Sequence, residues 1–233
     1  MLRIIFLFLL LAASGSLGLP PRSPKQNKNL ITELRNAHTA VDRAKILAKN
    51  GNRSLVFDYT NPPSDAVTIN TGGKFVAANG QTFPALTGVS AAMNLGRVAP
   101  CGVVATHIHP RADELVMVIQ GRLIAQSITE TGSVLFTNEL HAFSATIFNQ
   151  GAFHAQHNPD CTEAKFVASF NNNDPGSSPV APNFFMFDTE TVLGNLGVGN
   201  GTHLTDDDVE SIRLHMPVGN FAVEACLKKC GLK

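Results

Sequence analysis

The chain has 233 residues and no formal net charge at pH 7; hydrophobic residues make up 44% of it and charged residues 15%. This composition excludes an intrinsically disordered chain, and the neutral balance offers no basic patch for nucleic acid or an anionic membrane. The 19 glycines and 13 prolines, with many Val, Phe and Thr residues, favour a loop-rich β protein.

The N-terminus has the pattern of a secretory signal peptide. Arg3 supplies a positive charge, an apolar run follows from Ile4 to Ala13, and small residues lead up to Gly18. The alternative, a membrane anchor, would need about 20 apolar residues to cross a bilayer, and this run is shorter. We therefore predict a signal peptide over residues 1–18 and an exported mature protein with no membrane contact.

Two further features agree with export. Asn52 and Asn200 each begin an Asn-X-Ser/Thr triplet, so we expect them to accept N-linked glycans. The number of cysteines is even, which predicts two disulfides in an oxidising compartment, with three possible pairings. These residues are Cys101, Cys161, Cys226 and Cys230.

Apolar residues at helical spacing over residues 30–49 predict an amphipathic helix, broken near His38 and Thr39. From Val67 to about Phe187 the pattern changes to short apolar or alternating runs separated by turn residues. Many short strands at such spacing indicate an all-β sandwich or barrel.

Helical spacing returns over residues 204–229. Thr205 and the three aspartates after it predict a capped helix start, and Pro217 predicts the end of that helix. A second helix is expected to run from Phe221 to Lys229. We divide the mature chain into an N-terminal extension and helix (19–50), a β-barrel (51–190) and a C-terminal helical segment (191–233).

The segment THIHPRADELVMVIQGRL places unusual polar groups beside an apolar run. His107 and His109 are two residues apart, so they share one face of a strand. Glu114 opens the next predicted strand and returns beside the histidines if the two strands form a hairpin. A lone histidine in a β protein is usually a surface or hydrogen-bonded core residue, but a buried carboxylate without a partner is costly. We therefore interpret the three residues as metal ligands.

His154 is the predicted fourth ligand, because it lies on another extended run just after a glycine turn. One antiparallel register brings His107 opposite His154 and Cys101 to within one residue of Cys161. We therefore expect a disulfide between Cys101 and Cys161 across neighbouring strands, which leaves Cys226 to pair with Cys230.

At these residues the chain resembles the cupin superfamily, specifically its germin-like and spherulin-type members. The first cupin motif is matched at His107, His109, Glu114 and Gly121, and the second at Gly151, His154 and Asn158. The motif glycines expected at positions 101 and 143 are Cys101 and Phe143 here, and Asn149 replaces a proline. The segments HPRADE, NPDC and CLKKCG are similar to those of fungal and slime-mould spherulins.

The resemblance implies an exported, jelly-roll type cupin β-barrel with flanking helices, which binds manganese through three histidines and one glutamate. Imidazole also suits Fe, Ni and Zn, so the ligand types alone leave these metals open. Six-fold coordination would leave two positions for a small carboxylate or an oxygen species. The C-terminal helices help to hold plant germins together as hexamers, so a homo-oligomer is compatible with the sequence.

The resemblance leaves the activity open between two classes. As an enzyme, the protein would be an oxidoreductase of the superoxide dismutase or oxalate oxidase type. Germin-type oxalate oxidases resemble one another in having two asparagines in the pocket. The first corresponds to Asn94 here, but the second corresponds to Val104, and the loss of that hydrogen-bond donor weakens the case for oxalate oxidase. Otherwise it would be an encystment, cell-wall or storage protein with a structural metal. Asn158 is a further candidate for supporting the pocket, with stabilisation of the turn before Pro159 as the alternative.

Overall fold

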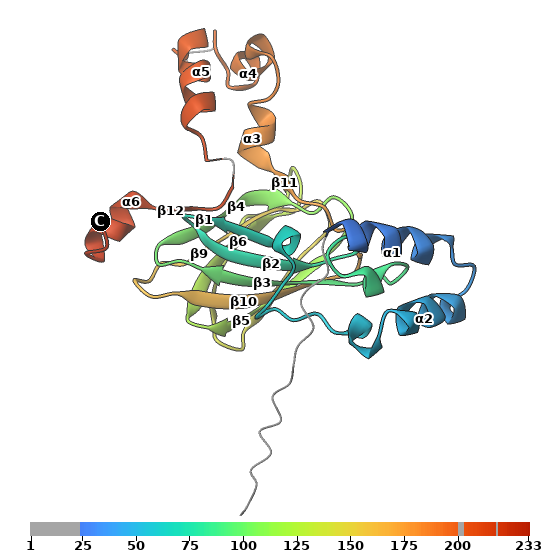
Figure 1. Cartoon of the computed structure of the whole chain (residues 1–233). Coiled ribbons are helices and arrows are strands. Elements are labelled where there is room, and N and C mark those ends of the chain that lie inside the picture. Colours follow the sequence, from blue (N-terminus) through green and yellow to red (C-terminus); the bar gives the residue numbers. More distant parts are fainter. Residues whose placement is uncertain (1–23, 200–202, 218) are drawn as a thin grey trace, which may run out of the picture.

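The protein is described by a computed structural model that covers residues 24–199, 203–217 and 219–233 (Figure 1). Its centre is a barrel-like pair of antiparallel sheets, which confirms the predicted all-β core. One sheet has the strand order β1-β2-β3-β10-β5-β8, and the other has the order β11-β4-β9-β6-β7, with β12 also paired to β4. The strands are β1 (Val67–Asn70), β2 (Gly73–Ala78), β3 (Ala92–Val98), β4 (Gly102–Ile108), β5 (Glu114–Gln120), β6 (Arg122–Ile128), β7 (Phe136–His141), β8 (Ala145–Phe148), β9 (Phe153–His157), β10 (Ala164–Phe170), β11 (Ser178–Pro179) and β12 (Phe221–Ala222).

The core lies between the two sheets and follows the alternation of the strands. In β5 and β10 every second residue is buried, because successive side chains of a strand point to opposite faces. The buried residues come from both sheets. They include Phe148 and Phe170, which also contact the candidate ligands described below. This arrangement makes the inner face of the barrel mostly apolar, and the predicted ligands are the main group of polar side chains on it.

Two helices precede the barrel, α1 (Pro24–Asn36) and α2 (Ala40–Lys49), so the predicted break near His38 and Thr39 is confirmed. Thr39 caps α2 by accepting a hydrogen bond from the backbone N–H of Asp42. Leu30, Leu34 and Leu47 form a small apolar cluster of their own. Three short 3-10 helices follow, η1 (Asn52–Leu55), η2 (Ser64–Ala66) and η3 (Pro84–Leu86). Within the described residues, no helix has the length and apolar character needed to cross a membrane.

The C-terminal region contains more helices than predicted, namely α3 (Val180–Phe184), α4 (Thr189–Asn195), α5 (Asp206–His215) and α6 (Glu224–Lys229). Thr205 caps the start of α5, as the sequence predicts, and together with Asp208 it forms a capping box. The predicted helix over 221–229 begins only at Glu224, because Phe221 and Ala222 pair with β4. The last barrel strand before the helices ends at Pro179, so the predicted boundary at 190 falls within α4. In Figure 1, α3, α4 and α5 extend away from the barrel.

The predicted signal peptide (1–18) and the predicted glycan acceptor Asn200 lie outside the described residues. The other predicted acceptor, Asn52, begins η1. These predictions therefore stay predictions.

Phe143, which stands where the cupin motif has glycine, adopts a left-handed backbone conformation with φ of 68°. Its side chain is 80% exposed, so the ring contributes little burial. A non-glycine residue in this region is strained by roughly 1–2 kcal/mol. We expect Phe143→Gly to raise the free energy of unfolding by about 1 kcal/mol after the larger entropy of an unfolded glycine is included. Urea unfolding measures this change, with Phe143→Ala as the control. The alanine retains the strained Cβ, so equal stabilisation by both variants would contradict backbone strain as the cause.

Candidate metal centre

The structure brings together the four side chains that the sequence predicts as ligands. His107 and His109 lie at the end of β4, Glu114 begins β5, and His154 lies in β9 directly opposite His107. One potential ligand atom from each residue lies within 4.8 Å of those of the other three. The group is deeply placed, with His109 6%, Glu114 4% and His154 2% exposed. Glu114 returns beside the histidines, but the predicted hairpin is wrong. The strands β4 and β5 belong to different sheets, and the turn between them carries the chain from one sheet to the other.

Each histidine ring is held by a hydrogen bond on its outer nitrogen. The Nδ1 atoms of His107 and His154 lie 2.8 Å from the carbonyl oxygens of Ala105 and Ala152. Nδ1 of His109 lies 2.5 Å from the carbonyl of Gly176. Because a carbonyl can only accept, Nδ1 must carry the proton in all three rings. Each Nε2 atom is then left with a lone pair that points into the site, as metal-binding histidines require.

The hydrogen bond from His109 to the carbonyl of Gly176 depends on glycine at position 176. Its φ is +71°, and a Cβ placed on it would lie 2.9 Å from the guanidinium of Arg111 and from the ring of Pro110. Arg111 forms an ion pair with Asp174 at 2.8 Å and holds this loop against the strand end. The loop after β10 thus positions the ring of His109.

The inward-facing atoms form a set that a cation would satisfy. Nε2 of His109 and Nε2 of His154 lie 3.2 and 3.0 Å from Oε2 of Glu114. Despite this proximity, all three atoms are buried without a hydrogen-bond partner of acceptable geometry among the described residues. Three neutral imidazoles and one carboxylate suit a divalent transition metal. The residues present therefore fit the metal that the sequence predicts.

Aromatic rings enclose the centre. Phe148 stacks on His154 with ring centroids 4.4 Å apart, and Phe170 contacts His109 edge-on at 4.7 Å. Both rings come from the sheet opposite to β4 and β9. They limit the rotation of the ligands and keep water away from this side of the centre.

The protonation of the site follows from burial and from Glu114. Burial lowers the pKa of His107 to about 4, and the neighbouring charge of His154 acts in the same direction. For Glu114, burial alone would raise the pKa, but the close His109 and His154 rings outweigh it and bring the pKa to about 2. Burial also opposes the charged form of His109, yet the Glu114 carboxylate outweighs this and raises the pKa of His109. The carboxylate is therefore ionised, and as the pH falls His109 takes up a proton before His107 does. A proton on the inner nitrogen of His109 would compete with a metal.

The low pKa of His107 predicts that the metal-free protein loses stability in mild acid. The unfolded chain binds this proton more readily than the folded chain between the ordinary pKa of 6.5 and the folded value of about 4. The contribution of His107 is therefore complete above pH 6.5 and is lost as the pH falls through this window, about 3 kcal/mol in all. Urea unfolding of chelator-treated protein at several pH values measures the slope.

The matched control for this slope is His107→Asn, which cannot titrate. The raised pKa of His109 acts in a different pH window. It stabilises the folded protein fully below pH 6.5, and this stabilisation is lost only as the pH rises above that value. An equally steep loss between pH 6.5 and 4 in His107→Asn would show that other groups cause it.

The two predicted pocket asparagines lie in different surroundings. Asn94 of β3 pairs with Ala168 of β10, and Ala168 pairs in turn with Val116 of β5. Since Val116 is fully buried, Asn94 lies on the inner face of its sheet. The amide of Asn158 donates hydrogen bonds to the carbonyls of Ala99 and Thr162, and its Oδ1 accepts one from the backbone N–H of Asp160. The side chain of Asn158 is thus occupied in stabilising a turn, the alternative that the sequence left open.

Gln156 is a buried polar residue near the candidate site that no sequence motif indicated. It lies two residues after His154 on the same face of β9, opposite the buried Val104 of β4. It is only 1% exposed, and neither atom of its amide has a hydrogen-bond partner among the described residues. The alternation of β9 could have identified it, since positions 154 and 156 share a face.

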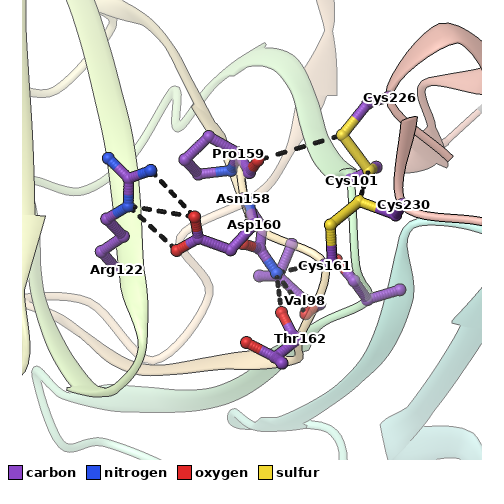
Figure 2. The surroundings of a disulfide bond; sticks show 11 residues. Val98, Cys101, Arg122, Asn158, Pro159, Asp160, Cys161, Thr162, Cys226 and Cys230 are labelled. Carbon is purple, nitrogen blue, oxygen red and sulfur yellow. Dashed lines mark hydrogen bonds and ion pairs between the residues drawn. A yellow bond between two sulfur atoms is a disulfide. The ribbon is translucent and has the colours of Figure 1, made fainter.

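The predicted disulfide pairing is wrong. The structure pairs Cys101 with Cys226 and Cys161 with Cys230, so both bonds tie α6 to the barrel (Figure 2). An irregularity between Val104 and His107 shifts the register by one residue, and the backbone N–H of Cys101 bonds to the carbonyl of Asp160. Docking of β12 beside the start of β4 then brings α6 to this end of the barrel. All four cysteines are bonded, as the sequence predicts.

Comparison with known proteins identifies relatives along most of the chain. Residues 59–200 match the family model described as Cupin. Spherulin-1A of Physarum polycephalum is 36% identical over 210 residues, which cover 90% of this chain and 82% of that protein. The germin-like protein subfamily 2 member 3 of Arabidopsis thaliana is 28% identical over 152 residues, covering 64% of this chain and 66% of that protein.

Solved structures support the same fold. A recombinant oxalate oxidase in complex with glycolate superimposes with a TM-score of 0.63 at 24% identity, over 72% of this chain and 83% of that chain. Oxalate decarboxylase from Bacillus subtilis gives a TM-score of 0.58 at 16% identity, over 72% of this chain and 41% of that chain. At such identities the likeness establishes the barrel architecture.

Proposed function

Since this chain belongs to the cupin family, with spherulins and germin-like proteins as its relatives, we propose that it is an exported manganese-binding oxidoreductase that acts on a small oxygen species. Export is supported by the predicted signal peptide and by two disulfides, which are typical of oxidising compartments. The observation that carries the metal proposal is the convergence of Nε2 of His109, Nε2 of His154 and Oε2 of Glu114, none of which has a hydrogen-bond partner in the described part of the chain.

Manganese bound to these four residues would supply redox capacity and a Lewis acid for an oxygen ligand. The protein provides one negative charge, from Glu114, so the site with a divalent cation retains a net positive charge that attracts an anion. The Nδ1 hydrogen bonds keep each imidazole in one orientation during turnover. Phe148 and Phe170 exclude water from their side of the centre.

The inner face favours a small anion over oxalate. Val104 is buried, with 7% of its surface exposed. It occupies the position at which oxalate oxidases have a pocket asparagine, so one hydrogen-bond donor for a second carboxylate is missing. The amide of Gln156 lies opposite Val104 and can donate to a small anion. These two residues support superoxide as the substrate in preference to oxalate.

Paired assays on one purified preparation test this proposal. The protein is loaded with manganese, its metal content is measured, and it is then assayed for superoxide dismutation and for peroxide release from oxalate. We expect dismutation without peroxide release. Peroxide release from oxalate would reverse the preference, whereas full manganese occupancy without either activity would contradict catalysis. In the latter case, a lower melting temperature after chelation would identify the metal as structural, as in a storage or encystment protein.

Replacing Gln156 by Leu should separate stability from activity. A buried amide without partners costs roughly 1–3 kcal/mol, and leucine has a similar volume, so we expect the metal-free protein to become more stable by about 1–2 kcal/mol. We also expect dismutation to slow at unchanged manganese content, because the donor to the anion is lost. Thermal unfolding and the superoxide assay measure the two effects. Unchanged activity per bound manganese would exclude Gln156 from the reaction.

A further inference from the structure

Three sulfur atoms form a cluster where α6 meets the barrel. The Sγ atoms of Cys101, Cys226 and Cys230 all lie within 4.8 Å of one another. Cys101 is bonded to Cys226, yet its sulfur also lies 3.7 Å from that of Cys230, which belongs to the other disulfide. Figure 2 shows the two disulfides side by side. Two sulfurs at this distance are close to van der Waals contact. The sulfur of Cys230 lies to the side of the Cys101–Cys226 bond, so a freed Cys230 side chain must rotate to attack along that bond.

The two disulfides differ in their access to solvent. Cys161 is exposed, whereas Cys101 is 1% exposed and lies beneath the start of β4. A thiolate from solution therefore reaches the sulfur of Cys161 first. Attack there breaks the Cys161–Cys230 bond and releases Cys230 as the leaving thiolate, which then lies beside Cys101.

We propose that Cys101, Cys226 and Cys230 form a thiol–disulfide exchange site, through which α6 changes its attachment to the barrel when a dithiol opens the Cys161–Cys230 bond. The thiolate of Cys230 attacks the sulfur of Cys101. A Cys101–Cys230 bond forms, the Cys101–Cys226 bond breaks, and Cys226 leaves as a thiolate that takes up a proton. This step is redox-neutral. The two electrons come from the dithiol, whose second thiol resolves the mixed disulfide on Cys161 and is itself oxidised to a disulfide.

The exchange moves the point of attachment along α6. Cys226 and Cys230 are four residues apart, about 6 Å along a helix axis. Cys101 directly precedes β4, the strand that carries His107 and His109, and the backbone N–H of Val223 bonds to the carbonyl of Cys101. A shift of α6 by one turn therefore acts at the start of a strand that holds two of the predicted metal ligands.

Two single-cysteine variants of the full chain test this proposal without any reductant. Cys161→Ala leaves Cys230 as a free thiol inside the cluster. Cys230→Ala leaves Cys161 free, and Cys161 is not a member of the group whose sulfurs lie within 4.8 Å. Rapid alkylation with N-ethylmaleimide and mass-spectrometric peptide mapping then identify the free thiol. We expect Cys161→Ala to carry label on both Cys226 and Cys230, in a ratio between about 10:1 and 1:10. Cys230→Ala should carry it on Cys161 alone.

Label only on Cys230 in the Cys161→Ala variant would overturn the proposal, because Cys101 would then have kept its bond to Cys226. A measurement on the unaltered chain guards against misfolding of the variants. After reduction with one equivalent of dithiothreitol, the exchange predicts molecules with a Cys101–Cys230 bond and with label on Cys161 and Cys226. Label confined to Cys161 and Cys230 would exclude the exchange.

Discussion

Replacing Glu114 by Gln is expected to lower the affinity for manganese by at least about 100-fold. Glu114 is the only anionic side chain in the group of four, and the pKa of about 2 keeps it ionised at every pH at which the protein would work. Glutamine preserves the shape but removes the charge that offsets the cation. Metal analysis after dialysis, with competition by a chelator of known affinity, measures the loss.

The control for this substitution is Glu139→Gln, which removes a carboxylate that is partly exposed and pairs with Arg122 on the barrel surface. Its manganese content should equal that of the unaltered protein. Retention of manganese at full affinity by the Glu114→Gln protein would remove Glu114 from the site and, with it, the proposed assignment of the metal.

Removing the Cys101–Cys226 disulfide is expected to be the most destabilising change outside the metal centre. The bond links residues 125 positions apart, and closing a loop of that length restricts the unfolded chain by an amount equivalent to roughly 2–5 kcal/mol. The double substitution Cys101→Ala with Cys226→Ala also leaves a gap at Cys101, which is fully buried. Denaturant unfolding under non-reducing conditions measures the change.

The comparison is Cys161→Ala with Cys230→Ala, which removes a bond spanning 69 positions at an exposed cysteine. We expect this pair to cost less, since the closed loop is shorter and Cys161 lies in solvent. An equal or larger loss from the second pair would show that the disulfides act mainly through the folded state around α6 and not through the unfolded chain.

Local patterns predicted the metal centre because its ligands are close in sequence or fixed by strand geometry. His107 and His109 share a face by the two-residue period of a strand, and only a short turn separates them from Glu114 at the start of the facing sheet. The position of His154 followed from antiparallel pairing, and the structure pairs it with His107. Capping chemistry predicted the start of α5 for the same reason, since Thr205 and Asp208 interact within one turn.

Other features depended on contacts between distant segments, which no local pattern contains. The carbonyl that orients His109 belongs to Gly176, 67 residues further along the chain. A β-bulge is a single-residue event with little sequence signature, and it changed the expected partner of Cys101. The buried amide of Gln156 also became evident only once both sheets enclosed it.

The sequence by itself determined the β-barrel, the four candidate ligands and the presence of two disulfides, because each follows from periodicity, spacing or an even cysteine count. Only the tertiary structure decided which cysteines are joined, which nitrogen of each histidine faces the candidate site, and which buried amide on the same strand face has no partner among the described residues. These depend on the docking of β12, α6 and the loop after β10 against the barrel. Such contacts span 60 or more residues, and they form only after the local elements have packed together.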